Sequence, residues 1–167
     1  MKAIDMPQGI NIERVRLTDR RQIEDIEQSS GIEPWTDDDW NRETRSSNSG
    51  WLVARDGFWS MCPVAGYVLF HLKHEFAEIR RLVVRREYRR KGIAERLIAR
   101  AEQSIVLASA TMAEVGQPPI REVIAEVPES MVAMQCALRA SRFKCVATTH
   151  GFDGDVYLFK KQLKVET

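Results

Sequence analysis

Hydrophobic and polar positions along the chain follow two periods, and each period predicts a different kind of element. From Asn11 to Leu17 apolar and charged residues alternate, which is typical of a half-buried strand. Apolar or β-branched runs predict further strands at 51–55, 64–72, 79–84, 121–127, 143–149 and 155–163. Helical spacing predicts helices at 19–29, around Trp40, from Gly92 to about Ser109, and at 129–140. After a lead-in of residues 1–10, the order β-α-α-β-β-β-α-β-α-β-β predicts an α/β fold.

The expected helix boundaries depend on capping residues and on helix breakers. Thr18 is positioned to cap the first helix, and Thr36, followed by three aspartates, resembles a capping box for the second. Gly116 and two nearby prolines predict a linker over 111–119. The aspartates at 37–39 could attract a cationic amine, but acidic residues are favoured at any helix start, and we prefer that interpretation.

The stretch from Glu78 to Ser104 joins a strand, a basic loop and an amphipathic helix. The start of such a helix has backbone N–H groups without partners in the helix and the positive end of its dipole. Gly92, at this start, has no Cβ to keep a ligand away, and Ala94 is small. Positive charge from Arg89, Arg90 and Lys91 surrounds the same point. The pattern predicts a pyrophosphate site, and the alternative is an ordinary strand–loop–helix unit with a solvated basic loop.

Composition limits the class of protein. A length of 167 residues predicts a single domain that spans residues 1–167. The hydrophobic content of 44% is typical of a soluble globular protein. No apolar run approaches the ~20 residues of a membrane span, and the first ten residues lack a signal-peptide core. Three cysteines without metal-like spacing favour free thiols and the cytoplasm. The net charge of +1 gives no general argument for nucleic acid, so neither nucleic acid nor membrane is expected as a partner.

The basic loop also carries a resemblance to a known family. The pattern Arg89-x-x-Gly92-x-Ala94, between a strand and a helix, resembles the acetyl-CoA signature of the GCN5-related N-acetyltransferase (GNAT) superfamily. The resemblance implies the GNAT fold, a mixed, mostly antiparallel sheet of about seven strands flanked by four helices. It also implies a bulged central strand that parts from the next one, with acetyl-CoA as co-substrate in the gap. The implied cofactor-binding residues are Leu82, Val83, Val84, Arg89, Arg90, Lys91, Gly92, Ile93 and Ala94.

Acetyl transfer to an amine requires a base for the amine and a polarised thioester carbonyl. Ile124-Ala125-Glu126-Val127 resembles the segment of bacterial ribosomal-protein N-terminal alanine acetyltransferases in which a glutamate serves as base. Ser130 and Phe143 fit the same alignment. The resemblance implies that Glu126 is catalytic, and the alternative is a carboxylate on the wet face of a strand.

The same enzymes have a Pro-Trp loop near the acceptor, which Pro34 and Trp35 resemble. These two residues are therefore the expected substrate-binding residues, although Trp35 could equally pack a helix corner. The implied acceptor is a primary amine, most like a protein N-terminus. A small-molecule amine and a non-catalytic acyl-CoA-binding domain are the alternatives. A homodimer is left open.

The helix at 129–140 departs from the family pattern. Leu138 stands where many relatives have the tyrosine assigned as general acid, and Met131 stands in place of an asparagine. Tyr157 is a candidate substitute acid, although a strand aromatic packed on its neighbours is the more common role. Cys136 is expected in the core rather than as a nucleophile. His71 and His74 have poor spacing for a metal, so no metal is expected.

Overall fold

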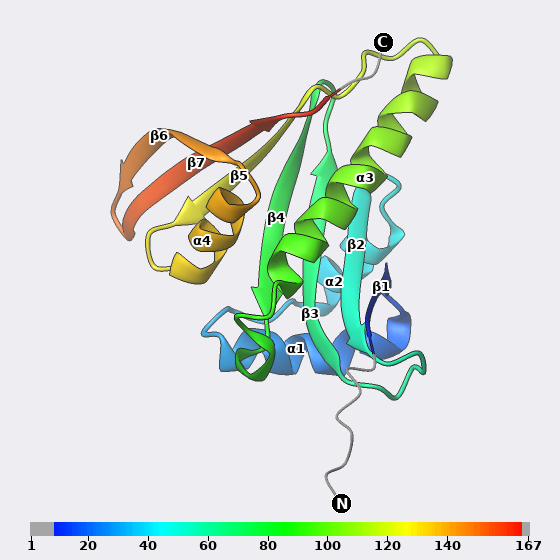
Figure 1. The fold of residues 1–167 in the computed structure, drawn as a ribbon, viewed down its shortest axis with the longest axis vertical. Coiled ribbons are helices and arrows are strands. Elements are labelled where there is room, and N and C mark those ends of the chain that lie inside the picture. Colours follow the sequence, from blue (N-terminus) through cyan, green and yellow to red (C-terminus); the bar gives the residue numbers. More distant parts are fainter. Residues whose placement is uncertain (1–8, 165–167) are drawn as a thin grey trace, which may run out of the picture.

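The structure is a computed structural model, and it describes residues 9–164, so most of the expected lead-in lies outside the described residues. Seven strands and four α-helices follow one another along the chain, with two short 3-10 turns (Figure 1). Their bounds are β1 (Ile10–Arg14), η1 (Leu17–Asp19), α1 (Arg20–Ser29), α2 (Asp37–Arg45), β2 (Ser49–Asp56), β3 (Val64–Leu72), β4 (Phe76–Val84), η2 (Arg86–Tyr88), α3 (Ile93–Glu114), β5 (Glu122–Pro128), α4 (Val132–Ala140), β6 (Lys144–Gly151) and β7 (Gly154–Gln162). The predicted order of elements is confirmed.

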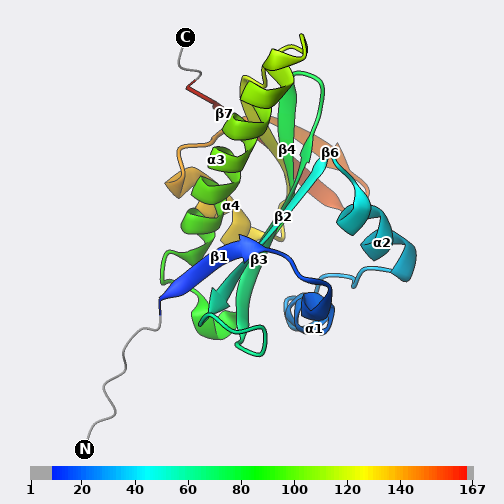
Figure 2. The same ribbon diagram turned by 90° about the vertical axis from the view of Figure 1, so that its right-hand side faces the viewer.

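All seven strands belong to one mixed sheet in the order β1-β2-β3-β4-β5-β7-β6. Neighbouring strands are antiparallel except β4 and β5, which are parallel. Helices α3 and α4 cover one face of the sheet, and α1 and α2 lie on the other (Figure 2). This arrangement is the expected α/β architecture of seven strands and four helices.

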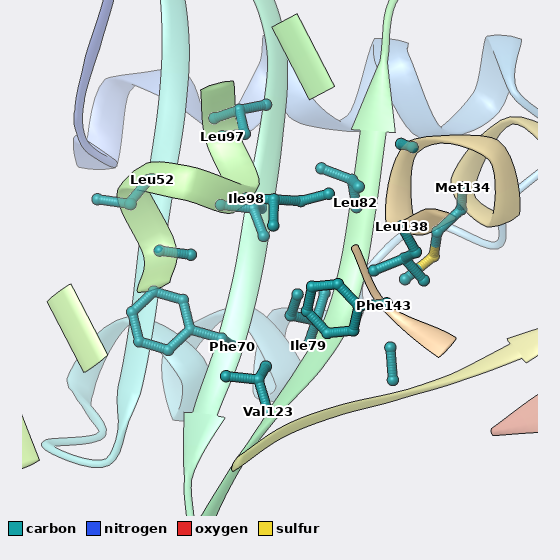
Figure 3. Close-up of a cluster of buried hydrophobic side chains, with 14 of the residues drawn as sticks. Leu52, Phe70, Ile79, Leu82, Leu97, Ile98, Val123, Met134, Leu138 and Phe143 are labelled. Carbon is teal, nitrogen blue, oxygen red and sulfur yellow. The ribbon is translucent and has the colours of Figure 1, made fainter. Parts of the chain in front are cut away.

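The larger core lies between the sheet and α3 with α4. The apolar positions that predicted α3 all point inward, since Ile93, Leu97, Ile98, Ala101 and Ile105 are buried. They pack on the inner faces of β2, β3 and β4, and Leu138 and Met134 of α4 join the same core (Figure 3). Burial of this kind stabilises the fold by roughly 1.5–3 kcal/mol for each large side chain.

A smaller core on the other face is rich in aromatic residues. Trp51 of β2 contacts Trp40 of α2, with ring centroids 4.8 Å apart, and Tyr67 of β3 at 5.9 Å. Ile23 and Ile26 of α1 complete this cluster. The two cores place the sheet between two helical layers.

The first helix does not start at the predicted cap. Thr18 caps nothing, because Leu17–Asp19 form a 3-10 turn and α1 begins at Arg20. The Asp19 carboxylate accepts the Arg16 backbone N–H at 2.8 Å and the buried Arg55 guanidinium at 2.7 Å. A buried ion pair at this corner therefore decides where the helix begins. Thr36 does cap α2, with its hydroxyl accepting the Asp39 N–H at 3.1 Å.

Three further expectations about helices are wrong. Helix α3 continues to Glu114, because its small and apolar residues favour helix until Gly116 turns the chain with φ 79°. Helix α4 begins at Val132 rather than Glu129, whose N–H bonds the Asp155 carbonyl of β7. Cys136 is exposed instead of buried, since the phase of α4 turns Gln135 inward.

Strand β4 has two irregularities that matter for function. Its pairing with β3 shifts by one residue, so that Phe70 faces Ile79, Leu69 faces Arg81, and Arg80 is an extra, bulged residue. Its pairing with β5 covers only Phe76–Glu78. Beyond that point the two strands diverge (Figure 1). The bulge and the parting agree with the expected GNAT geometry.

Substituting Gly66 by alanine is predicted to destabilise the protein by about 1–3 kcal/mol. A Cβ at Gly66 would lie 2.6 Å from the Val83 carbonyl oxygen, and this backbone atom cannot rotate away. Urea unfolding measures the effect. Gly9→Ala is the control, because nothing lies within 4 Å of its added Cβ. Equal stability of the two variants would contradict this view of the β3–β4 pair.

Candidate active site

The connection from β4 to α3 forms a cationic turn with a bare helix start. Gly92 is the N-cap of α3 with φ 75°, and no side chain within the described range 9–164 caps the helix. This left-handed φ favours glycine, and nothing lies within 4 Å of the place where a Cβ would stand. Among residues 9–164, the first N–H groups of this 22-residue helix have no side-chain cap. A helix start of this kind is a candidate site for an anion.

The basic residues of this turn differ in how firmly they are held. Arg89 donates through Nε to the Val84 carbonyl at 3.0 Å, which ties the turn to the end of β4. Arg90 and Lys91 are exposed, and neither forms an ion pair within the described residues. Arg90 also has a left-handed φ of 61°. Of the remaining predicted cofactor residues, Ile93 is buried and Ala94 is partly buried beneath the same turn. The turn thus offers fixed N–H donors and mobile cations to one ligand.

The turn is fastened to the neighbouring strands. The Tyr88 hydroxyl donates to Asp56 Oδ2 at 2.8 Å, and Arg85 Nε donates to the Val64 carbonyl at 3.0 Å. Burial, and then the Asp56 hydrogen bond, raise the pKa of Tyr88 to about 12. These bonds hold the end of β2 and the start of β3 against the turn.

Strand β4 presents a free edge next to this turn. Leu82, Val83 and Val84 pair with β3 on one side. On the other side, β5 pairs with no residue of β4 after Glu78. Leu82 is buried in the core under α3, while Val83 is buried in the aromatic core on the other face. An extended ligand can therefore pair with the backbone of this edge.

Glu126 lies on β5, on the far side of the opening. Val123, Ala125 and Val127 are buried in the core under α3 and α4. Because side chains alternate along a strand, Glu126 points to the other face, and it is exposed. That face is also the one on which α1, α2 and Trp35 lie.

Tyr157 lies on the opposite face from Glu126. It pairs with Val127 in the register of β5 and β7, and it packs against the core that contains Leu138. Leu138 is the residue in the place of the usual family tyrosine, and it is fully buried. Tyr157 and Glu126 therefore lie on opposite faces of the sheet.

The Pro34-Trp35 loop covers a buried ionic cluster that the sequence analysis missed. Glu27 of α1 is fully buried, and its Oε1 accepts from Tyr67 at 2.5 Å and from Arg81 at 2.8 Å. The Arg81 guanidinium stacks on the Trp35 ring at 3.9 Å. Pro34 is exposed and Trp35 is partly buried, so Trp35 packs the cluster and could still line a site. One signal was available, since Glu27 follows Ile23 by four residues and so lies on the inner face of its helix.

The electrostatics of this cluster are dominated by burial. Burial raises the pKa of the Glu27 carboxyl above its usual value, although hydrogen bonds from Tyr67, Arg81 and the Trp35 backbone oppose the rise. Burial and the adjacent Glu27 also raise the pKa of Tyr67. Glu27 Oε2 and Trp35 Nε1 are buried without a partner among the described residues. Such unsatisfied buried atoms are uncommon in folded proteins.

The histidines lie apart from this cluster. His71 Nε2 contacts Glu43 Oε2 at 2.7 Å, and Ser49 donates to the same oxygen at 2.8 Å. His74 is exposed. Within residues 9–164, no group of three or more His, Cys, Asp and Glu side chains is placed to hold a metal ion. In the same range, no helix has both the length and the apolar character needed to cross a membrane.

The raised pKa of Tyr88 gives a test of the turn. With a pKa of about 12 against an ordinary 10.0, Tyr88 keeps its proton in the folded state. Its contribution to stability is complete below pH 10 and is lost as pH rises through 12. A tyrosinate absorbance difference between the protein and its Tyr88→Phe variant should be small at about pH 11. The substitution Asp56→Asn should lower the pH at which the Tyr88 hydroxyl ionises. Half-ionisation of Tyr88 near pH 10 in the native protein would contradict the observed contacts.

Comparison with known proteins agrees with this geometry. Residues 20–115 match the acetyltransferase (GNAT) family, whereas no curated protein matches the chain. The fold is similar to the ribosomal-protein-S18-alanine N-acetyltransferase from Escherichia coli, with 14% identity and a TM-score of 0.73 over 95% of this chain and 97% of that one. It is also similar to Arabidopsis thaliana NAA60 in complex with acetyl-CoA, with 20% identity and a TM-score of 0.72 over 93% and 100% of the two chains. A phosphinothricin acetyltransferase from Sinorhizobium meliloti, in complex with AcCoA, has 17% identity and a TM-score of 0.69 over 92% and 88%.

At these sequence identities, the similarity to solved structures shows a shared fold only. The match to the family model is additional evidence from the sequence itself. That match covers more than half of the 167 residues. It runs from α1 through the bulged β4 and the basic turn to the end of α3. The basic turn, the start of α3 and the free strand edge therefore all lie inside it, and the chain belongs to the GNAT family of acetyltransferases.

Proposed function

We propose that this chain moves an acetyl group from acetyl-CoA to a primary amine by direct attack of the amine on the thioester. The observation that carries the proposal is an uncapped helix start joined by one turn to a strand edge that has no partner beyond Glu78 in the described part of the chain. The helix start can bind a diphosphate and the strand edge can bind an amide-bearing arm. Acetyl-CoA carries both groups in the corresponding order along one extended molecule.

The proposed cofactor residues act in two groups. The backbone of β4 binds the extended arm, and the turn binds the diphosphate, with Arg90 and Lys91 adding charge. Arg89 fixes the turn through its bond to the Val84 carbonyl. Bound acetyl-CoA supplies the acetyl thioester. The residues in these groups are Leu82, Val83, Val84, Arg89, Arg90, Lys91, Gly92, Ile93 and Ala94.

Glu126 is the proposed base. Its carboxylate is exposed on the face that also bears the Pro34-Trp35 loop, so it can reach an incoming ammonium ion directly or through water. Removal of one proton gives the neutral amine, which can attack the thioester carbonyl. The support for this role is position on the strand beside the opening, together with the family resemblance of the surrounding segment.

Tyr157 is the proposed acid for the departing thiolate. It packs against the core that contains Leu138, the residue in the place of the usual tyrosine. A phenol on this face of the sheet could replace the missing one. If the thiolate leaves without a proton, Tyr157 is a packing residue only.

The proposed acceptor is a protein N-terminus, and Pro34 and Trp35 are the proposed acceptor contacts. One support is the Pro34-Trp35 loop, which lies over the buried ionic cluster of Glu27 and Arg81. The other is the activity named for the Escherichia coli structural neighbour. We treat residues 1–167 as one domain. Cys62, Cys136 and Cys145 are all free thiols, and we propose the cytoplasm as the location.

Substituting Gly92 by glutamate should abolish coenzyme A binding, because a carboxylate would stand where the phosphates bind. In the unsubstituted protein, coenzyme A at about a hundredfold over its Kd should raise the Tm by roughly 5–10 °C. Gly116→Glu is a matched control, since Gly116 ends the same helix with a similar φ of 79° and equally open space. A thermal shift that survives Gly92→Glu would rule out the proposed diphosphate site.

Substituting Glu126 by glutamine should lower kcat by about 10²–10⁴-fold and leave the KM for acetyl-CoA unchanged. Thiol release from acetyl-CoA in the presence of amine acceptors measures this. Glu122→Gln is the control, because Glu122 lies on the same strand and face but pairs with Gln162. Unchanged turnover in Glu126→Gln would show that another group removes the proton.

The same assay tests the proposed acid. If Tyr157 donates a proton to the thiolate, Tyr157→Phe lowers kcat for thiol release. Full activity of Tyr157→Phe at every pH would leave packing as its only role.

A further inference from the structure

The bulge in β4 changes the face on which Arg81 lies. In a regular strand, Ile79 and Arg81 would share a face, and Arg81 would point into the apolar core under α3. Because Arg80 is an extra residue without a partner on β3, the alternation shifts by one position after it. Leu82 then joins Ile79 in the core under α3, and Arg81 lies with Val83 on the opposite face. The bulge therefore aims an arginine at the face that bears Glu126 and Trp35.

The Arg81 side chain is held in one orientation. Nη1 donates to Glu27 Oε1 at 2.8 Å, and the guanidinium plane stacks on the Trp35 ring at 3.9 Å. Glu27 is itself fixed by full burial and by the Tyr67 hydroxyl. A guanidinium has five N–H donors, and the 2.8 Å bond to Glu27 uses one of the two on Nη1. The side chain is 26% exposed, so part of this donor set reaches solvent.

The position of Arg81 is close to the proposed reaction. It directly precedes Leu82, the first residue of the proposed cofactor edge, and β5 has already parted from β4 at this level. Glu27 balances the charge of Arg81 through a single carboxylate oxygen. This hydrogen bond uses only one of the five N–H donors of the guanidinium. A preorganised guanidinium with free donors binds a carboxylate strongly and with a fixed geometry.

We propose that Arg81 selects acceptors that carry a carboxylate within a few bonds of the reacting amine. The inference rests on the proposed acetyl transfer and narrows its substrate class. Two sources have this chemistry: a free amino acid, through its own carboxylate, and a polypeptide whose first residue is acidic. Arg81 is the residue that determines specificity, and Glu27 with Trp35 positions it.

The test measures recognition without requiring turnover. Coenzyme A is joined through an acetyl bridge to the amine of Asp-Ala-Gly-amide or of Asn-Ala-Gly-amide, which differ in charge but hardly in shape. A second pair uses alanine and alaninamide. Isothermal titration should give roughly tenfold tighter binding for the carboxylate member of at least one pair. The pair that shows the difference identifies the source, and equal affinity within both pairs would overturn the proposal.

Variants then assign the preference to Arg81. Arg81→Gln should reduce the affinity ratio to about one and leave the affinity for coenzyme A unchanged. Arg80→Gln removes the same charge one residue away, from a side chain that is 50% exposed and paired with Glu78. It should keep the preference, and an equal loss in Arg80→Gln would refute a direct contact with Arg81.

Loss of Arg81 alone leaves Glu27 buried without its ion pair, which can destabilise the fold. The double variant Glu27→Gln/Arg81→Gln avoids this problem, because it replaces both partners with neutral amides. It should fold, bind coenzyme A and show no carboxylate preference, and a retained preference would count against the inference. A protein that prefers the carboxylate conjugates but never releases thiol would keep this inference and lose the transferase proposal.

Discussion

The site depends on one constraint, the parting of β4 from β5 after only three paired residues. A strand in the middle of a sheet normally uses both edges, and buried backbone groups without partners are costly. Here β4 is paired along β3 while its other edge is free from Ile79 onward. The cores on both faces keep the strand in place, so the edge stays open without collapsing. An extended ligand with amide groups can form hydrogen bonds with this free edge.

The bulge at Arg80 and the parting of the strands act together. The bulge shifts the alternation of β4, so that Leu82 anchors the strand under α3 while Arg81 reaches the other face. The Arg81 guanidinium is stable in this half-buried position because it donates a hydrogen bond to Glu27 and lies over the Trp35 ring. A single register change thus links the cofactor edge to the loop proposed to meet the acceptor.

The predictable parts of this molecule were those encoded over short distances. The helix start at Gly92, the basic turn and the strand before it are local, and the structure contains them where the pattern indicated. The Glu27–Arg81 pair joins residues 54 positions apart, and the bulge is a property of two strands, so neither could be derived from local periodicity. The error at Thr18 has the same origin, since Arg55 holds Asp19 across 36 positions. For Cys136, the apolar context was correctly recognised but the phase of the helix was not.

The sheet itself divides the proposed chemistry. Glu126 is exposed on the face with the Pro-Trp loop, and Tyr157 packs on the face with α3 and α4. In a direct transfer, the amine would lose its proton on the side from which the acceptor arrives, while the thiolate of coenzyme A would take up a proton on the side of the proposed acid. Two groups on opposite faces suit these two proton movements better than two groups on one face. The buried Leu138 then has a physical explanation, because the phenol on β7 packs against the same core and an apolar residue in α4 completes that core.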